Sequence, residues 1–599
     1  MDTNAIFGYP LDNELILRKQ KSIRRELLSR TGINYVDKRI AILGGSTTSN
    51  IKNILELFLL QAGIKPQFYE SEYNKYYEDA LFGTPLLDEF EPEIIIIFTS
   101  AVNILEKPSI RDDLVSVQAK LDSEFNRFKQ MWENLSEKYN AAIIQNNMEL
   151  PYIRSLGNLE TVLPFGMSRF IERLNIRFAD YAASHGNFYI HDLHELSARI
   201  GLRRWHNRAQ YHSYKFAMDY DVVPDVSSGL AKIIKAILGK TKKCLVLDLD
   251  NTLWGGVIGD DGLNGIKIGH ETPEAEFYME FQRYVLGLKE RGIILAVCSK
   301  NDEDIAKSGF THPDSVLKVD DFAAFHANWE PKDQNIRAIA EELNIGTDSL
   351  VFIDDNPVER QIVRENLPEV SVPEVDATDP FSYIRSIEEA GYFEFVALSE
   401  EDFKRSESYV SNRKRTELAH SVSDYDDFLK ALDMRAEIGS FREVYFDRIA
   451  QLTNKTNQFN LTTRRCTRAE IEAMANAPKY ITLYGRLEDK FGDNGLVTVV
   501  IGERRGDELH IILWLMSCRV LKRGLERAML DALINEAEGV GLKKIVGYYF
   551  KTPKNKMVSM LYEEFGFKRI SQTADDTVWE LDTNDYVAEK NFIEVNMGD

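Results

Sequence analysis

Short, continuously apolar segments recur along this chain, and stretches with helical periodicity separate them. Examples are "RIAILGG" at residues 39–45, "EIIIIFTS" at 93–100 and "CLVLDLD" at 244–250. An apolar run bounded by turn residues, with helices on either side of it in sequence, is typical of a strand buried in a parallel sheet. We therefore expect an α/β multidomain protein, in which helices cover the faces of each sheet.

The size and charge of the chain restrict its class and its partners. At about 150 residues per domain, a chain of 599 residues contains several domains. A formal net charge of -22 disfavours nucleic acid and anionic membrane surfaces as partners. The N-terminus lacks the order of a signal peptide and no apolar run is long enough to cross a bilayer, so we expect a cytoplasmic protein.

Changes of pattern along the chain predict its domain organisation. Two α/β regions come first, a charged helical connector follows, and the strands "GLVTVVIGER" and "ELHIILWLMS" then indicate an α+β domain with adjacent antiparallel strands. The predicted segments are a helical lead-in at 1–37, α/β domains at 38–235 and 236–376, a connector at 377–431, the α+β domain at 432–583 and a tail at 584–599.

Two aspartates close the first strand of the second α/β domain. Because side chains alternate along a strand, Asp248 and Asp250 point the same way at the carboxyl edge, where open α/β sheets bind ligands. Later blocks of the domain bring further polar groups to this edge, namely Ser299, Lys332, Asp354 and Asp355. The sequence therefore predicts one polar site at the edge of this sheet.

The residue types at this edge suit phosphoryl transfer. Clustered carboxylates need a hard cation, so we expect Mg²⁺ held by Asp248, Asp250, Asp354 and Asp355. Asp248 would attack phosphorus and Asp250 would exchange a proton with the leaving oxygen. Ser299 and Lys332 would hold the phosphoryl oxygens. The alternative is that the aspartates cap a loop and Lys332 is a surface charge.

In order and type these blocks resemble the motifs of the haloacid dehalogenase-like (HAD) phosphatase superfamily, with "DLDNTL" as the first motif. The resemblance implies a Rossmann-like α/β fold. Only residues 254–271 separate the first motif from the helix that follows it, and no long insertion follows the second motif. We therefore expect a capless domain with an open site, to which a second protein can present a substrate.

The last domain resembles the acyl-CoA N-acyltransferase (GNAT) fold in "LMSCRVLKRGLERAMLDAL" and "NKMVSMLYEEFGF". A turn before a helix offers backbone N–H groups to an anion, and the resemblance implies cofactor binding there and a tyrosine acid. The predicted residues are Arg519, Lys522, Arg523, Gly524 and Tyr562. Because a lysine replaces the first glycine of the family's turn, we expect a phosphopantetheine arm of an acyl carrier protein here rather than acyl-CoA.

The segments "DLDNTLWGGVIGDDG", "SKND", "DDNPVER", "TNKTNQFNLTTRR" and "SCRVLKRGLE" together resemble the FkbH family. The resemblance implies that a glyceryl unit is taken from 1,3-bisphosphoglycerate, loses phosphate and is loaded onto an acyl carrier protein. Lactate or another small hydroxy acid remains an alternative acyl group. A plain Mg²⁺-dependent phosphatase and a non-enzymatic carrier-docking scaffold are the other two interpretations.

Two thiols and one basic patch are candidates for handling the acyl group. The cysteines Cys244, Cys298, Cys466 and Cys518 lack paired spacing and are expected to be free. A thiolate can capture an acyl phosphate, and Cys298 and Cys518 are the candidates. Carrier proteins of this kind are generally acidic, so the docking patch is predicted at Arg519, Lys522, Arg523, Arg527 and residues 551–556, with a solvated helix face as the alternative.

The first α/β domain resembles the SGNH fold, which is flavodoxin-like. In "ILGGSTTSN", Ser46 follows a strand and precedes a helix, as the nucleophile of GDSL-type esterases does. Its partner would come from "HDLHEL", but Asp192 and His194 are separated by one residue, whereas the esterase pattern has two. We expect a non-catalytic scaffold or docking domain, with an esterase as the alternative.

Overall fold

The computed structural model forms two compact units, described separately below: Met1–Ile237 with Thr467–Glu470, and Leu238–Cys466 with Ile471–Asp599. The structure describes residues 6–33, 35–376, 378–379, 381–397, 403, 415, 418, 424–552, 554–573 and 575–598. Within these residues, none of the helices has the length and hydropathy that a membrane span needs.

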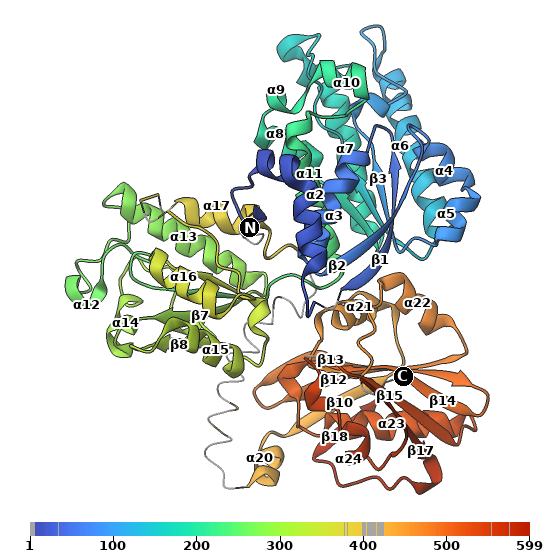
Figure 1. Ribbon diagram of the computed structural model, residues 1–599, viewed down its shortest axis with the longest axis vertical. Coiled ribbons are helices and arrows are strands. Elements are labelled where there is room, and N and C mark those ends of the chain that lie inside the picture. The colour runs from blue at the N-terminus through green and yellow to red at the C-terminus, as the bar shows by residue number, and fades with distance from the viewer. Residues whose placement is uncertain are drawn as a thin grey trace. The chain divides into compact units, whose positions relative to one another are not determined.

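The first unit is built on a five-stranded parallel sheet with the strand order β2-β1-β3-β4-β5. Figure 1 labels three of these strands, β1, β2 and β3. The apolar runs of the sequence form its inner strands, with Ile40 paired to Ile94. Both are fully buried, as strands between two helical layers must be. The strands are β1 (Val36–Gly44), β2 (Ile64–Glu70), β3 (Ile94–Phe98), β4 (Ala142–Asn146) and β5 (Phe188–His191).

Helices cover both faces of this sheet. Trp132 of α6 and Phe178 of α7 pack with Leu43 and Ile97 in one apolar core, and α2 and α11 pack against α3. The predicted lead-in thus contains a helix, α2, which packs onto this unit. The helices are α2 (Asn13–Ser29), α3 (Ser49–Gln61), α4 (Tyr76–Phe82), α5 (Pro85–Phe90), α6 (Leu114–Lys138), α7 (Met167–Ser184), α8 (Leu193–Ile200), α9 (Leu202–Trp205), α10 (Arg208–Tyr214) and α11 (Val223–Ile237).

The second unit begins with a four-stranded parallel sheet in the order β8-β7-β6-β9. Its strands are β6 (Cys244–Leu247), β7 (Ile294–Ser299), β8 (Ala324–Ala327) and β9 (Leu350–Ile353). Strand β6 pairs with β7 on one side and with β9 on the other. The chain therefore reverses its direction of winding at β6, and ligands bind beyond the carboxyl ends of strands at such a point.

The helices of the domain built on this sheet, called the phosphatase-like domain after its sequence resemblance, follow its strands in sequence. Thr272 caps the first turn of α13, and Pro273 occupies the first helical position, where its missing N–H costs nothing. The helices are α12 (Ile258–Asp261), α13 (Pro273–Glu290), α14 (Glu303–Gly309), α15 (Lys332–Glu342), α16 (Pro357–Asn366) and α17 (Phe381–Ala390). Tyr383 and Ile387 of α17 pack into the core of this domain, which extends past the boundary predicted at 376.

A mainly antiparallel sheet in the order β16-β17-β15-β14-β13-β12-β10-β18 forms the third domain, and β11 pairs with β14. Helix α23 (Leu525–Gly539) packs on one face of the sheet, and α21 (Phe446–Lys455) and α22 (Arg468–Asn476) pack on the other. The strands are β10 (Met434–Gly439), β11 (Phe459–Asn460), β12 (Tyr480–Asp489), β13 (Gly492–Arg505), β14 (Glu508–Met516), β15 (Lys544–Phe550), β16 (Lys568–Gln572), β17 (Asp576–Asp582) and β18 (Ile593–Met597).

Two predicted segments differ from the structure around this domain. The tail expected at 584–599 contains β18, which pairs in parallel with β10. The connector expected at 377–431 ends in α20, whose Phe428 and Leu429 join the core of the third domain. Most of the connector between residues 398 and 423 lies outside the described residues. The remaining helices are α20 (Tyr425–Ala431) and α24 (Leu561–Glu564).

A buried carboxyl group gives the first unit a testable pH dependence. Both side-chain oxygens of Glu149 lie 3.3 Å from the backbone nitrogen of Ala101. Burial raises the pKa of Glu149 to about 8 from its ordinary value of 4.5. The stability that the neutral carboxyl group contributes is therefore full below pH 4.5 and is lost as the pH rises towards 8.

Glu149→Gln, which stays neutral, should therefore remain stable where the wild type weakens. We expect the thermal unfolding midpoint of the first unit to fall from pH 5 to pH 8.5 in the wild type and to fall less in the variant. Glu137→Gln on the exposed face of α6 is the matched control. Equal pH dependence of the wild type and Glu149→Gln would contradict the assignment of a neutral buried carboxyl group.

Candidate active site

The predicted site residues of the phosphatase-like domain meet at the carboxyl edge of its sheet. Asp248 follows β6, and its backbone nitrogen donates to the carbonyl oxygen of Ile353 at 2.9 Å, which continues the ladder between β6 and β9. Asp354 follows β9, Ser299 ends β7, and Lys332 begins α15. All four of these polar side chains are buried. Four polar side chains from different segments of the chain are thus shielded from water at one edge of the sheet.

Lys332 joins two of the aspartates. Its Nζ lies 3.0 Å from Oδ1 of Asp248 and 2.5 Å from Oδ2 of Asp354. Burial alone would lower the pKa of Lys332, but the charges of Asp248 and Asp354 outweigh it and raise the pKa above its ordinary value. The lysine is therefore a fixed cation in the site rather than a surface charge.

Three carboxylates share this site. Asp248, Asp354 and Asp355 each offer an oxygen, and these oxygens lie within 4.8 Å of one another. Burial raises the pKa of Asp355 to about 6, and the negative charge of Asp248 adds to the shift. Burial and Asp248 likewise raise the pKa of Asp354, although Lys332 opposes them. One ammonium does not balance three carboxylates, and an all-oxygen set of this kind fits Mg²⁺.

Asp250 does not belong to this carboxylate group, so its predicted role as a side-chain metal ligand is corrected. Its Oδ1 accepts hydrogen bonds from Nε1 of Trp254 at 2.9 Å and from the backbone nitrogen of Ile258 at 3.0 Å. Its Oδ2 accepts one from Nδ2 of Asn301 at 3.1 Å. Burial raises the pKa of Asp250. A fixed carboxyl group with a raised pKa suits the exchange of protons with a leaving oxygen.

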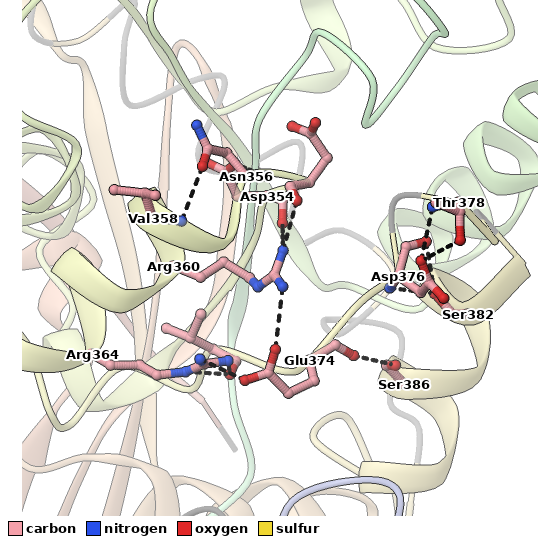
Figure 2. Close-up of polar contacts among 12 residues, drawn as sticks. Asp354, Asn356, Val358, Arg360, Arg364, Glu374, Asp376, Thr378, Ser382 and Ser386 are labelled. Carbon is pink, nitrogen blue, oxygen red and sulfur yellow. Dashed lines mark hydrogen bonds and ion pairs between the residues drawn. The ribbon is translucent and has the colours of Figure 1, made fainter.

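A second layer of contacts holds the Asp354 and Asp355 backbone (Figure 2). Nη1 of Arg360 donates to the carbonyl oxygens of both aspartates at 2.8 Å. Nη2 of Arg360 lies 3.2 Å from Glu374, which also pairs with Arg364 at 2.6 Å. Neither these residues nor Trp254 and Asn301 were predicted as site residues from the sequence. The quoted segments "DDNPVER", "DLDNTLWGG" and "SKND" contain Arg360, Trp254 and Asn301, but sequence alone does not show which atoms they hold.

Comparison with known proteins agrees with this geometry. Residues 39–235 match the family model described as FkbH, N-terminal domain. The chain is also similar to the N-terminal part of protein BF1531 from Bacteroides fragilis, described as containing a phosphatase domain complexed with Mg. The identity is 35%, the TM-score is 0.59, and the match covers 63% of this chain and 99% of that chain. This chain belongs to the same family as that phosphatase-domain protein.

Other matches are weaker. The ribosomal-protein-S18-alanine N-acetyltransferase from Escherichia coli has 17% identity and a TM-score of 0.20, over 26% of this chain and 97% of that one. The structure of yncA from Salmonella typhimurium with acetyl-CoA gives the same values. No curated protein matches this chain.

The thiol beside the phosphatase site is buried. Cys298 lies on β7 next to Ser299, and its Sγ donates to the carbonyl oxygen of Lys332 at 3.7 Å. Burial raises the pKa of Cys298. Because a thiolate is the nucleophilic form, this environment disfavours the acyl-capturing role that was expected of Cys298. Cys244 and Cys466 are also buried.

Cys518 follows β14 of the third domain, is half-buried, and lies near the amino ends of β6 and β9, opposite the end that carries Asp248. Its carbonyl oxygen accepts a hydrogen bond from Nδ2 of Asn344 at 2.9 Å. Cys518 and Asn344 line a cavity of about 500 Å³ with Lys243 and Ser349, the residues just before β6 and β9. A four-residue strand spans roughly 13 Å, so Cys518 and Asp248 do not share one site.

The structure buries part of the basic patch predicted in the third domain, whereas Lys522, Lys551, Lys554 and Lys556 are exposed. Arg519 and Arg523 are buried, and Arg523 pairs with Asp489 at 3.1 Å. Arg415 pairs with the same aspartate at 2.8 Å. On α23, Nη1 of Arg527 lies 2.5 Å from the carboxylate of Glu589. Arg523 and Arg527 are thus paired within the protein, and a docking role for the exposed lysines stays a prediction.

Two further expectations for this domain are corrected. The backbone nitrogens of Lys522 and Gly524 do not face outward, because both donate to the carboxylate of Glu526. Tyr562 is buried, its hydroxyl has no hydrogen-bond partner, and burial raises its pKa. Its position in the core does not suit an acid that meets a substrate.

The first unit shows no esterase pair among its described residues. Ser46 is buried, and its hydroxyl oxygen has no hydrogen-bond partner. Nδ1 of His194 lies 3.4 Å from Nδ2 of Asn175, and Asp192 caps α8 by accepting from the backbone nitrogen of Glu195. His191 is buried, which lowers its pKa to about 4. This arrangement favours the scaffold interpretation.

The contacts of Asp250 yield a prediction about positioning. Asn301→Ala removes the hydrogen bond to Oδ2 and leaves Asp248, Asp354 and Asp355 untouched. A hydrogen bond to a charged group is worth about 1.5–3 kcal/mol, so we expect kcat for phosphate release from a phosphate monoester, 3-phosphoglycerate, to fall by roughly 10- to 100-fold. The Mg²⁺ concentration for half-maximal activity should stay unchanged.

Trp254→Phe removes a different hydrogen bond to the same carboxyl group and should act in the same direction. A matched control is Asn366→Ala, which loses an exposed hydrogen bond to Asp333 on the same domain. A large increase in the Mg²⁺ requirement with unchanged kcat would show that Asn301 supports the metal ligands rather than Asp250.

Proposed function

We propose that this chain is a Mg²⁺-dependent enzyme that processes a three-carbon acyl phosphate, 1,3-bisphosphoglycerate, and transfers the glyceryl unit to an acyl carrier protein. The observation that carries the proposal is the position of Lys332 between Asp248 and Asp354, with Asp355 within reach. A phosphatase-type activity agrees with the family of the chain. The proposal goes beyond the family in naming the acyl acceptor, which is the phosphopantetheine thiol of the carrier.

The side chains of the site divide the work on the C3 phosphate monoester. The carboxylate of Asp248 attacks phosphorus, the P–O bond to the sugar acid breaks, and Asp250 gives a proton to the leaving oxygen. Lys332 and Ser299 hold the phosphoryl oxygens. Asp250 then takes a proton from the water that hydrolyses the aspartyl phosphate. Bound Mg²⁺ would neutralise the phosphoryl oxygens that face the carboxylates.

Acyl transfer uses the other phosphate of the substrate. The thiolate of the carrier arm attacks the acyl carbon, the C–O bond to the C1 phosphate breaks, and inorganic phosphate leaves with the bonding electrons. The buried position of Cys298 and the distant position of Cys518 argue against a relay through either thiol. We therefore propose that the carrier thiol takes the acyl group directly.

The short connection between Asp250 and α13 supports access to the site by a second protein. Between Asp250 and α13, the described chain contains a single helix, α12, of four residues. An arm attached to a carrier can enter a site that no cap domain covers. A plain phosphatase would need no such access, and its substrate would be a free small molecule.

Incubation with Mg²⁺, acyl carrier protein and 1,3-bisphosphoglycerate separates the interpretations. Intact-mass spectrometry of the carrier should show the added mass of a glyceryl group, and phosphate release should accompany it. Phosphate release without a gain in the mass of the carrier would favour the interpretation as a plain phosphatase. If the protein binds the carrier but neither phosphate nor acylated carrier forms, the non-enzymatic docking scaffold would be the remaining interpretation.

Asp248→Asn tests the nucleophile. The neutral amide is a poor nucleophile and weakens the carboxylate group that fits Mg²⁺, so we expect phosphate release to fall by at least about 10³-fold. Asp302→Asn makes the same chemical change at an exposed position of this edge and should retain activity. Near-normal turnover of Asp248→Asn would show that Asp248 does not attack phosphorus.

A further inference from the structure

Strands β14 and β15 of the third domain pair over only part of their length. Their parallel register joins Glu508–Ile511 to Lys544–Gly547, and no pairing between the two strands follows it among the described residues. Strands that stop pairing leave backbone N–H and C=O groups available to an added extended segment, such as an amide-containing arm. The space beyond Ile511 is therefore where such an arm would pair.

The chain fills this space itself. Phe459 and Asn460, which form β11, pair with Met516 and Leu515 of β14. The backbone nitrogen of Leu461 donates to the carbonyl oxygen of Trp514 at 3.0 Å. The segment from Phe459 to Leu461 thus takes the backbone partners that β14 would offer to a ligand.

The same segment is bound to β15 on its other side. The backbone nitrogen of Phe550 donates to the carbonyl oxygen of Leu461 at 2.8 Å. Nδ2 of Asn555, which follows β15, donates to the carbonyl oxygen of Asn460 at 2.9 Å. Asn460 and Leu461 are 0% exposed. The segment therefore bridges the two strands as a buried part of the sheet.

A carboxylate fills the anion position at the turn before α23. The backbone nitrogen of Lys522 donates to Oε1 of Glu526 at 2.8 Å, and that of Gly524 donates to Oε2 at 3.2 Å. Both residues have positive φ, 62° and 92°, which turns their N–H groups towards one oxygen pair. Glu526 is 8% exposed. Free N–H groups at a helix start bind phosphate, and here the protein supplies the anion.

We propose that residues of the third domain itself fill both places where acyl-CoA would bind, namely the gap beside β14 and the turn before α23. Residues 459–461 stand where the amide-containing arm would pair with β14, and the carboxylate of Glu526 stands where a diphosphate would bind. The domain therefore does not take acyl-CoA as a donor, and the pantetheine arm of a carrier does not enter this gap. This inference is independent of the chemistry proposed at Asp248.

Hydrogen exchange of the full chain tests the strand part without any substitution. Amides of residues 459–461 and 514–516 should exchange slowly in the free protein, and 1 mM coenzyme A or acetyl-CoA should leave their exchange unchanged. Ligand-induced protection or exposure of these peptides would overturn the proposal. The measurement localises binding, so coenzyme A held by the phosphatase-like domain does not confuse it.

Glu526→Ala tests the anion part, with inorganic pyrophosphate as the probe and no Mg²⁺. Removal of the carboxylate should free the N–H groups of Lys522 and Gly524. We expect pyrophosphate to protect amides 521–526 in the variant and to bind there at least ten times more tightly than in the wild type. Glu536→Ala, an exposed position on the same helix, changes the net charge equally and should behave as the wild type.

Thermal unfolding establishes that the variants are folded before binding is compared. A folded Glu526→Ala protein in which pyrophosphate does not protect residues 521–526 would overturn the assignment of Glu526 as an internal anion. If Glu526→Ala does not fold, Glu526→Gln serves in its place, since it keeps one acceptor oxygen and should show a smaller gain. No gain in a folded Glu526→Gln protein would also count against the proposal.

Discussion

The buried ammonium of Lys332 is the interaction on which the phosphatase-like site depends. Three carboxylates at the end of one small sheet repel each other, and Lys332 reduces that repulsion for Asp248 and Asp354 directly. Removal of one partner of such a buried pair typically costs about 3–5 kcal/mol, because the remaining charge is left without compensation. The remaining negative charge gives the site its fit for a divalent cation.

The rest of the second unit is arranged around that edge. Arg360 fixes the backbone of Asp354 and Asp355, while Trp254 and Asn301 fix Asp250. By contrast, the residues of the third domain that were candidates for chemistry are satisfied internally: Glu526 binds the turn and Tyr562 lies in the core. Among the described residues, the groups that suit catalysis therefore lie together at the carboxyl end of the sheet formed by β6 to β9.

The residues of the phosphatase-like site were predictable because they depend on local rules. Alternation along a strand placed Asp248 and Asp250 on one side, and the ends of parallel strands meet at one edge. The side-chain partners of Asp250 were not predicted, because the hydrogen bonds of Trp254 and Asn301 depend on how the loops after β6 and β7 pack together. The burial of Arg523 within the predicted basic patch was not predicted either, because its partner Asp489 lies on β12, far from it in sequence.

The tail and the strand gap show the same limit at the level of the fold. Residues near the C-terminus look like a polar end of the chain, yet β18 completes the edge beside β10. The segment "TNQFNL" contributes to the resemblance to the FkbH family. Its pairing with β14 is possible only because the pairing between β14 and β15 ends at Ile511 and Gly547. Long-range strand pairing has no local signature in one sequence.

The central claim is that Asp248 accepts a phosphoryl group at a Mg²⁺ site. The most direct measurement is to quench the reaction with acid within milliseconds, reduce the acyl phosphate with borohydride and map the modified residue by peptide mass spectrometry. The account predicts modification at Asp248, formed only when Mg²⁺ is present. Phosphate release with no modified Asp248, or equal modification without Mg²⁺, would contradict it.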